Sequence, residues 1–446
     1  MKVPDMEFPL DRGLVGRIIE SQRIEMERVN IREMAKVVKA IEGETGVEFL
    51  RMEIGIPGLP LSGIAPAAEA EALAEGRGTE YAPFEGTERL RKAASQFIKV
   101  FLNLDIPWEY CVATNGAMQG GFVSQAIAGE LRPDRRTILY IDPSFPVNRL
   151  QARFLGLTVD SVDLYDHRGD NLVAAIEERF RRGDVGGLLW SSPNNPSWVI
   201  LKDSEIEGIA RLLDRHDVLG IEDLAYVCMD FRQDYSKPGV PPYPPCIGHY
   251  GKNYILLLSG SKAFNYAGQR IGVAAVSPSL AGRRYPNLVD RFGTDLVGEA
   301  FMKGGVYPMT AGVSQSSQNG LAALMEKACS GEYDFVGQVR EYAVRARHMK
   351  KTMLSSGFSL VYDNDLGEPL ADGFYFTVRY NGMTAGELLT EMLLYGLSAI
   401  PLSVSGSKST DGIRVCVSKI KTDELGEFDK RIHRFKQDHS RTPAGR

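Results

Sequence analysis

Residues 254–270 (YILLLSGSKAFNYAGQR) decide the fold class of this chain. The first five are apolar without interruption, which is typical of a strand buried on both faces of a sheet. Lys262 follows that strand, at the edge where open α/β sheets place their ligand clefts. Its amine can condense with a carbonyl if its surroundings lower its pKa, and Ser259, Ser261 and Arg270 offer donors to a phosphate. An aldehyde-reactive amine beside a phosphate site predicts pyridoxal 5′-phosphate as the cofactor.

The pattern Ser-x-Ser-Lys, with an arginine eight positions after the lysine, resembles the lysine signature of class I and II aminotransferases. For an isolated motif, a surface lysine after a core strand is an equally good interpretation, so other family elements must be present. The resemblance implies fold type I, an α/β chain with a large, mostly parallel α/β/α sheet domain that binds pyridoxal phosphate and a smaller α+β domain. It also implies that Lys262 forms a Schiff base with the cofactor.

A second strand end lies upstream, where the apolar residues 218–221 run into EDLAY at 222–226, similar to the family's Asp-x-Ala-Tyr. The resemblance implies that Asp223 keeps the pyridine nitrogen protonated and that Tyr226 donates to the cofactor's phenolic oxygen. Strand alternation puts Glu222 on the opposite face. Taken alone, Asp223 would first be interpreted as a helix cap.

A third strand, residues 187–190, leads into the loop SSPNNPSW at 191–198, which resembles the family's Asn-Pro-x-Asn-Pro-Thr-Gly. The resemblance assigns Asn195 to the phenolic oxygen and to the substrate side of the site. Ser192 replaces the usual first Asn and Trp198 the usual Gly. Because glycine tolerates a positive φ and tryptophan does not, the local backbone path at Trp198 is left open.

The phosphate cradle is expected at the start of a helix that runs to residue 128, because helix N-termini present free N–H groups to anions. Gly116 permits close approach, and the N–H groups of Ala117 and Met118 are predicted to meet the phosphate. Residues 139–146 resemble the family's strand and proline turn, which makes Phe145 the candidate for stacking on the pyridine ring. A simple Gly turn and a core phenylalanine are the structural alternatives.

Three outer positions complete the resemblance. Tyr81, in EYAPFEGTERLR at 80–91, matches the family tyrosine that reaches the phosphate of the neighbouring subunit, so the resemblance implies a homodimer with shared sites. Arg414, in GIRVCV at 412–417, matches the arginine that pairs with the substrate's α-carboxylate. Gly55 matches a position near the same carboxylate. A solvated strand face is the alternative interpretation of Arg414.

The composition of the chain limits its possible domain number, partners and location. A chain of 446 residues, 43% of them hydrophobic, can form one large and one smaller domain. The net charge of −5 disfavours a nucleic-acid surface. Five dispersed cysteines without CxxC or zinc spacing predict no metal site and fit a reducing compartment. The chain opens without a signal peptide or long apolar span, which predicts a cytoplasmic protein with no membrane segment.

We expect residues 1–60 to contribute to the small domain, 61–328 to form the large cofactor-binding domain, and 329–446 to form the small C-terminal domain. The smaller expectations are a crossover at 56–60, helical spacing over 10–41, a long helix over 335–355, strands at 373–378 and 412–417, a helix at 384–394, a surface loop at 237–245 and a frayed tail at 437–446.

The implied activity is transfer of the amino group of an α-amino acid to a 2-oxo acid, with Lys262 also moving the Cα proton. A fold type I lyase, such as a carbon–sulfur β-lyase or a decarboxylase, is the alternative, because the same site supports those reactions. A cofactor-binding regulator is disfavoured, since residues 1–60 are too few for a winged helix-turn-helix and linker. Residues 304–319, where dicarboxylate-specific relatives carry an arginine for the partner's site, contain none, which disfavours aspartate or glutamate as donor.

Overall fold

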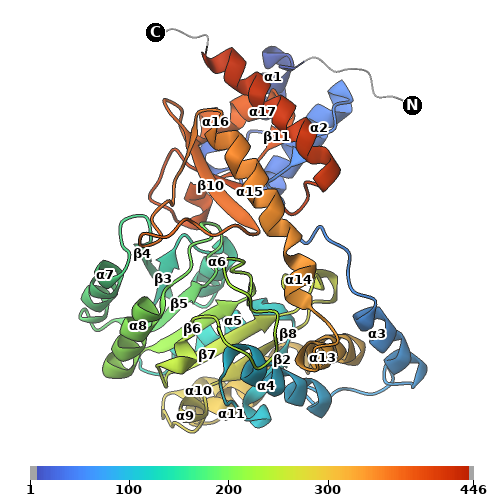
Figure 1. Cartoon of the computed structure of the whole chain (residues 1–446). Coiled ribbons are helices and arrows are strands. Elements are labelled where there is room, and N and C mark those ends of the chain that lie inside the picture. The colour runs from blue at the N-terminus through green and yellow to red at the C-terminus, as the bar shows by residue number, and fades with distance from the viewer. Residues whose placement is uncertain (1–7, 441–446) are drawn as a thin grey trace.

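A computed structural model of the chain describes residues 8–440 (Figure 1). Its largest element is a seven-stranded sheet, in which strand β8 runs antiparallel to both of its neighbours and the other adjacent pairs are parallel. In spatial order the strands are β2 (Cys111–Thr114), β8 (Gly272–Val276), β7 (Tyr254–Ser259), β6 (Leu219–Leu224), β5 (Val185–Ser191), β3 (Thr137–Asp142) and β4 (Thr158–Asp163). The predicted α/β class with a mostly parallel sheet is confirmed.

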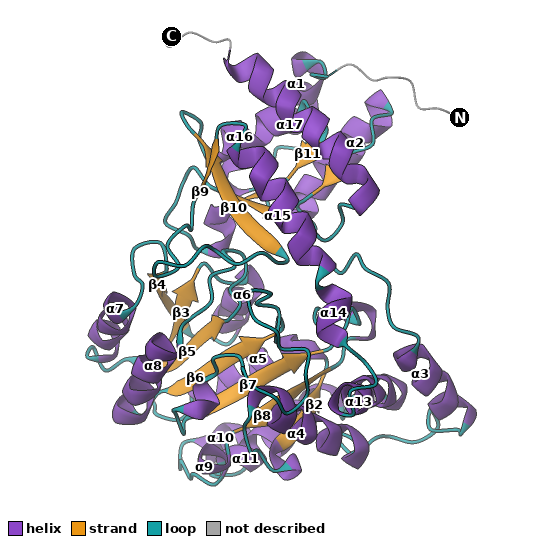
Figure 2. Ribbon diagram, in the orientation of Figure 1, coloured by secondary structure: helices purple, strands orange, loops and turns teal. Residues whose placement is uncertain are grey.

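Helices cover both faces of this sheet, as Figure 2 shows. Side chains alternate along β3, so that Leu139 and Ile141 enter one core while Ile138 and Tyr140 enter the other. The first core is closed by α4 (Glu88–Leu102), α7 (Asp170–Phe180), α8 (Asp203–His216) and α13 (Gln315–Cys329), against which α3 (Ile64–Ala74) packs. The second is closed by α5 (Gly116–Ala128), α6 (Pro146–Phe154), α9 (Pro278–Ala281), α10 (Leu288–Phe292), α11 (Val297–Glu299) and a π-helix (Ala300–Val306) that leads into α12 (Tyr307–Thr310).

A second, smaller assembly joins the two ends of the described chain. It holds a four-stranded antiparallel sheet in the order β12 (Ile400–Pro401), β13 (Ile413–Cys416), β10 (Tyr375–Tyr380) and β9 (Phe358–Leu360), and a parallel pair of β1 (Leu50–Arg51) with β11 (Leu397–Ser398). Its helices are α1 (Arg12–Ser21), α2 (Ile31–Thr45), α15 (Glu341–Leu354), α16 (Ala385–Leu393) and α17 (Leu425–Ser440). In Figure 1 the blue N-terminal helices lie beside the red α17, and one core contains side chains from both.

Two local predictions were wrong. The helix expected over 335–355 is interrupted at Arg340, which separates α14 (Phe335–Val339) from α15, because the N–H of Arg340 bonds the carbonyl of Gly337 in a tighter turn. Residues 437–440 are not frayed, since α17 continues to Ser440 and the ring of His439 stacks on Phe435. Residues 441–446 of the expected tail lie outside the described residues.

The remaining local expectations agree in full or in part: α1 and α2 lie where helical spacing was expected over 10–41, although residues 22–30 between them contain only a 3₁₀ turn at Met26–Arg28. Helix α16 begins after a Thr384 capping box, and the loop at 237–245 contains no helix or strand. The predicted domain boundaries at residues 60 and 328 stay predictions.

Within residues 8–440, no helix combines the length and apolar character needed to cross a bilayer.

Candidate active site

A cavity of about 290 Å³ lies at the ends of β5, β6 and β7, between the two assemblies. All but three of the predicted site residues line it: Gly55, Ala117, Met118, Phe145, Asn195, Asp223, Tyr226, Ser259, Ser261, Lys262 and Arg270. These residues come from segments far apart in the chain, so the sheet topology brings the sequence motifs together. Sequence reasoning missed several other wall residues, among them Ser144, Asn148 and Tyr375.

Lys262 follows β7 and its amine reaches into this cavity. The Nζ atom donates a hydrogen bond to the carbonyl oxygen of Gly55 and lies 5.1 Å from the centre of the Phe374 ring. Burial lowers the pKa of Lys262 to about 8, and the positive charges of Arg414 and Arg270 act in the same direction. About a tenth of the amine is therefore neutral at pH 7, far more than for an ordinary lysine, and the neutral form is the nucleophile.

Asp223 ends β6 on the cavity side. Its Oδ1 accepts the N–H of Ala225 at 3.0 Å, and burial raises its pKa to about 6, although the charge of Lys262 opposes that shift. Glu222 points to the other face, where it accepts hydrogen bonds from the Cys246 thiol at 3.2 Å and the Ile247 N–H at 2.9 Å. The alternation expected along this strand is present, and only Asp223 faces the cavity.

The N-terminus of α5 forms one end of the cavity. Gly116 has a φ of +68°, and a Cβ built on it would lie 2.7 Å from Nη2 of Arg270. This close approach lets the guanidinium lie against the helix start, where Ala117 and Met118 line the wall. Arg270 donates to the carbonyl of Ala267 at 3.0 Å and to Oγ of Ser261 at 3.4 Å. Among the described residues Arg270 has no carboxylate within ion-pair distance, so this end of the cavity carries an unpaired positive charge.

The loop after β5 forms another wall, to which Asn195 contributes. The N–H of Asn195 donates to Oγ of Ser191 at 3.3 Å, and the neighbouring Asn194 anchors the loop by donating to the carbonyl of Pro143 at 2.9 Å. Tyr226 also lines the cavity, and its hydroxyl donates to the hydroxyl of Tyr375 at 3.1 Å.

Trp198 closes this loop with a φ of +61°, so a tryptophan adopts the left-handed conformation that the usual glycine would take. Its ring is fully buried and lies edge-on to Tyr226, with ring centres 5.1 Å apart. Gly373 makes room for it, since a Cβ there would overlap the indole. Packing of this large ring offsets a backbone strain of about 1–2 kcal/mol.

Arg414 is not on the cavity wall, where the sequence placed the carboxylate partner. It is 2% exposed, and its guanidinium lies 4.9 Å from the centre of the ring of Tyr375, which is itself a wall residue. Nη2 donates to the carbonyl of Glu53 at 2.5 Å, while Nε is buried without a hydrogen-bond partner. No carboxylate among residues 8–440 forms an ion pair with it. The pairing of β10 with β13 sets Tyr375 opposite Cys416 and Thr377 opposite Arg414, so Tyr375 and Arg414 are diagonal neighbours on one face of the sheet.

The two other predicted residues away from the wall are Gly116, which lies next to Arg270, and Tyr81. Tyr81 is 92% exposed and lies outside the cavity of its own chain. The signal for Tyr375 was present in GFYF at 373–376, which sequence reasoning treated only as a strand.

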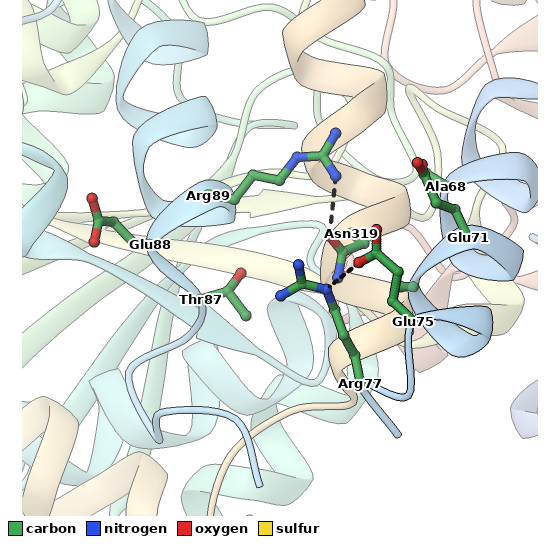
Figure 3. Close-up of a pocket in the computed structure, with 9 residues that line it drawn as sticks. Ala68, Glu71, Glu75, Arg77, Thr87, Glu88, Arg89 and Asn319 are labelled. Carbon is green, nitrogen blue, oxygen red and sulfur yellow. Dashed lines mark hydrogen bonds and ion pairs between the residues drawn. The ribbon is translucent and has the colours of Figure 1, made fainter. Parts of the chain in front are cut away.

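A second hollow, of about 320 Å³, lies on the outer surface between α3, α4 and α13, and Figure 3 shows its lining. Both of its arginines already have partners: Arg77 bonds Glu75 at 2.8 Å, and Arg89 bonds Asn319 at 3.0 Å. It contains none of the predicted site residues. In the part of the chain that the structure describes, no cluster of metal-ligating side chains occurs.

Comparison with known proteins agrees with this geometry. The sequence profile of the family described as aminotransferase class I and II matches residues 57–432. The chain is 28% identical over 242 residues to the aspartate/prephenate aminotransferase of Thermus thermophilus, an alignment that covers 53% of this chain and 58% of that protein. It is 27% identical over 239 residues to LL-diaminopimelate aminotransferase 2 of Trichormus variabilis, covering 51% and 57%. The alignments thus span little more than half the length of these curated relatives.

The fold extends further than the alignments. A mutant of Thermus thermophilus aspartate aminotransferase superposes with a TM-score of 0.72 at 18% identity, covering 94% of this chain and 98% of that one. At this identity the likeness concerns the fold alone, which is fold type I. Since the family profile spans most of the sequence, this chain belongs to the class I and II aminotransferases.

Proposed function

We propose that this protein is a pyridoxal-phosphate-dependent aminotransferase that transfers the amino group of an α-amino acid to a 2-oxo acid. One observation carries the proposal. A single cavity combines a lysine amine of lowered pKa, a carboxyl group of raised pKa at the end of the neighbouring strand, and an unpaired arginine at a helix N-terminus. These are the groups that the aldehyde, the pyridine nitrogen and the phosphate of the cofactor require.

The residues present fit the cofactor. The cradle between Gly116 and Arg270 would hold the phosphate, together with Ser259 and Ser261. Asp223 would hold a proton on the pyridine nitrogen, and Phe145 would pack against the ring. When bound, the cofactor withdraws electrons from the substrate's Cα and so makes the Cα proton acidic. Lys262, once free, is the base within the cavity that accepts this proton and returns it.

Arg414 supports a substrate with an α-carboxylate. A buried guanidinium without an anionic partner is costly to maintain, and a planar carboxylate offers it two parallel hydrogen bonds. The cavity wall carries three charged residues, Asp223, Lys262 and Arg270, and each already has a role. Because residues 8–440 offer the substrate side chain no further cation on that wall, we propose amino acids without an acidic side chain as the preferred donors.

Tyr81 supports a homodimer with shared sites. With Leu73 it lines a shallow hollow beside residues 310–316, and the neighbouring Tyr307 and Met309 are also exposed. Large apolar side chains gathered in this way are typical of a surface that another chain covers. A second copy of this chain is the proposed occupant, with Tyr81 reaching the partner's phosphate end. The five cysteines are unpaired, which supports a reducing, cytoplasmic location.

The test is a panel of single amino acids incubated with the cofactor-loaded protein, with and without a 2-oxo acid. Amino transfer predicts that a new amino acid forms in equal amount to the donor consumed, and only when the 2-oxo acid is present. Release of sulfide, ammonia or carbon dioxide without an acceptor would instead identify the lyase alternative. A Lys262→Ala chain serves as the inactive control.

A further inference from the structure

Tyr375 is a wall residue for which no sequence motif supplied a role. It begins β10, and its ring is held on three sides: by the guanidinium of Arg414 at 4.9 Å, by Trp198 at 6.2 Å, and by Phe374 at 5.0 Å between ring centres. Gly55 lies against its hydroxyl so closely that a Cβ there would overlap it. The position of the Tyr375 hydroxyl is therefore fixed by packing.

That hydroxyl lies 3.1 Å from the hydroxyl of Tyr226, which here is the donor of the pair. Each phenol carries one proton and two acceptor lone pairs. Within the described chain the Tyr375 hydroxyl makes no other hydrogen bond, so its proton is available. The pair can thus reverse its direction by turning two O–H bonds, with neither ring moving.

We propose that Tyr375 is a positioning residue, whose hydroxyl donates to Tyr226 when Tyr226 donates to the phenolic oxygen of the cofactor. This inference rests on the proposed function. In a chain of two hydrogen bonds each one polarises the next, so donation from Tyr375 strengthens donation from Tyr226. A stronger bond to the phenolic oxygen favours its anionic form and lowers the pH at which the cofactor linked to Lys262 loses its proton.

Other groups also face this pair of hydroxyls and contribute to the same titration. Asp223 and Cys416 act on Tyr226, while Arg414, Cys416 and Tyr342 act on Tyr375. Lys262 faces the same cavity. A change in the midpoint pH of the cofactor's titration is therefore assigned to the hydroxyl pair only if that change disappears when the Tyr226 hydroxyl is removed.

The experiment is a pH titration of the visible absorption of the pyridoxal-phosphate-loaded protein in four forms: unchanged, Tyr375→Phe, Tyr226→Phe and the double variant. Phenylalanine keeps the ring contacts of Tyr375 and removes only the hydroxyl. We expect Tyr375→Phe to raise the midpoint by about 0.5–1 pH unit and to add nothing in the Tyr226→Phe background. Tyr395→Phe, which removes a buried hydroxyl bonded to Asp438, is the control and leaves the midpoint unchanged.

An unchanged midpoint in Tyr375→Phe would overturn the inference, and so would an equal shift with and without Tyr226. These outcomes leave the proposed function standing, because the absorption band itself demonstrates the linked cofactor. If the unchanged protein forms no band that borohydride abolishes, the proposed function fails and the role of Tyr375 fails with it.

Discussion

The amine of Lys262 donates its hydrogen bond to the carbonyl oxygen of Gly55, which lies 207 residues earlier in the chain. Two residues before Gly55, the carbonyl of Glu53 accepts a hydrogen bond from Arg414. One short segment therefore provides backbone oxygens to two of the cations that the proposed reaction uses, Lys262 and Arg414. Each must release that oxygen when its own partner, an aldehyde or a carboxylate, arrives.

The first prediction concerns the pH dependence of the Lys262 amine. Below its pKa of about 8 the group is a cation and cannot attack a carbonyl, and above it the neutral amine predominates. In the cofactor-free protein, the rate at which an aldehyde and cyanoborohydride label Lys262 should rise about tenfold per pH unit up to about pH 8 and then level off. A rate that still rises tenfold per unit above about pH 9 would show that burial does not depress this pKa.

Asp223→Asn removes the negative charge proposed to lie beside the pyridine nitrogen and keeps the side-chain shape. Loss of a charge-assisted hydrogen bond costs at least about 2–3 kcal/mol in the barrier, which lowers kcat by roughly 30- to 150-fold. Cofactor affinity should change less, because the phosphate contacts at Arg270 and α5 remain. Glu222→Gln on the opposite face is the matched control, and a larger loss of kcat there would mean that the wrong carboxylate was assigned.

Gly116→Ala tests the phosphate cradle. Both its φ of +68° and the 2.7 Å approach of Arg270 oppose a Cβ at this position. Gly239 has a similar φ of +72°, but nothing lies within 4 Å of the point that a Cβ would occupy there, so Gly239→Ala carries the backbone strain alone. We expect Gly116→Ala to weaken cofactor binding at least about tenfold in a fluorescence titration, and Gly239→Ala to leave it unchanged. Equal affinities in the two variants would exclude Gly116 from the cradle.

Tyr81 tests the composite site. Chains with Tyr81→Ala and chains with Lys262→Ala are each defective, but a mixed dimer contains one site with both residues intact. After subunit exchange, activity should rise above that of either parent toward a statistical fraction of the unchanged protein. If exchange is demonstrated and no activity returns, or if the active species sediments as a monomer, Tyr81 serves only its own chain.

Much of the site followed from the sequence because its residues sit at strand ends and helix starts, which local patterns reveal. The apolar run before Lys262 and the glycine before Ala117 predicted where a strand ends and a helix begins, and Lys262 and Ala117 both lie on the cavity wall. Glu222 and Asp223 were separated correctly by strand alternation.

Long-range packing could not be predicted in the same way. The positive φ of Trp198 depends on the space that Gly373 leaves 175 positions later, and no local propensity favours it. The contact between Tyr375 and Arg414 depends on the register between β10 and β13, which a single sequence does not specify. The break at Arg340 likewise reflects a hydrogen bond to Gly337 and not a helix-breaking residue.

The central claim is that Lys262 is the residue that binds the cofactor covalently. The most direct measurement is borohydride reduction of the pyridoxal-phosphate-loaded protein, followed by digestion and mass spectrometry of the modified peptide. The account predicts one reduced adduct per chain, on Lys262, and none in Lys262→Ala, which should still retain the cofactor without a covalent bond. An adduct on a different lysine, or none in the unchanged chain, would contradict it.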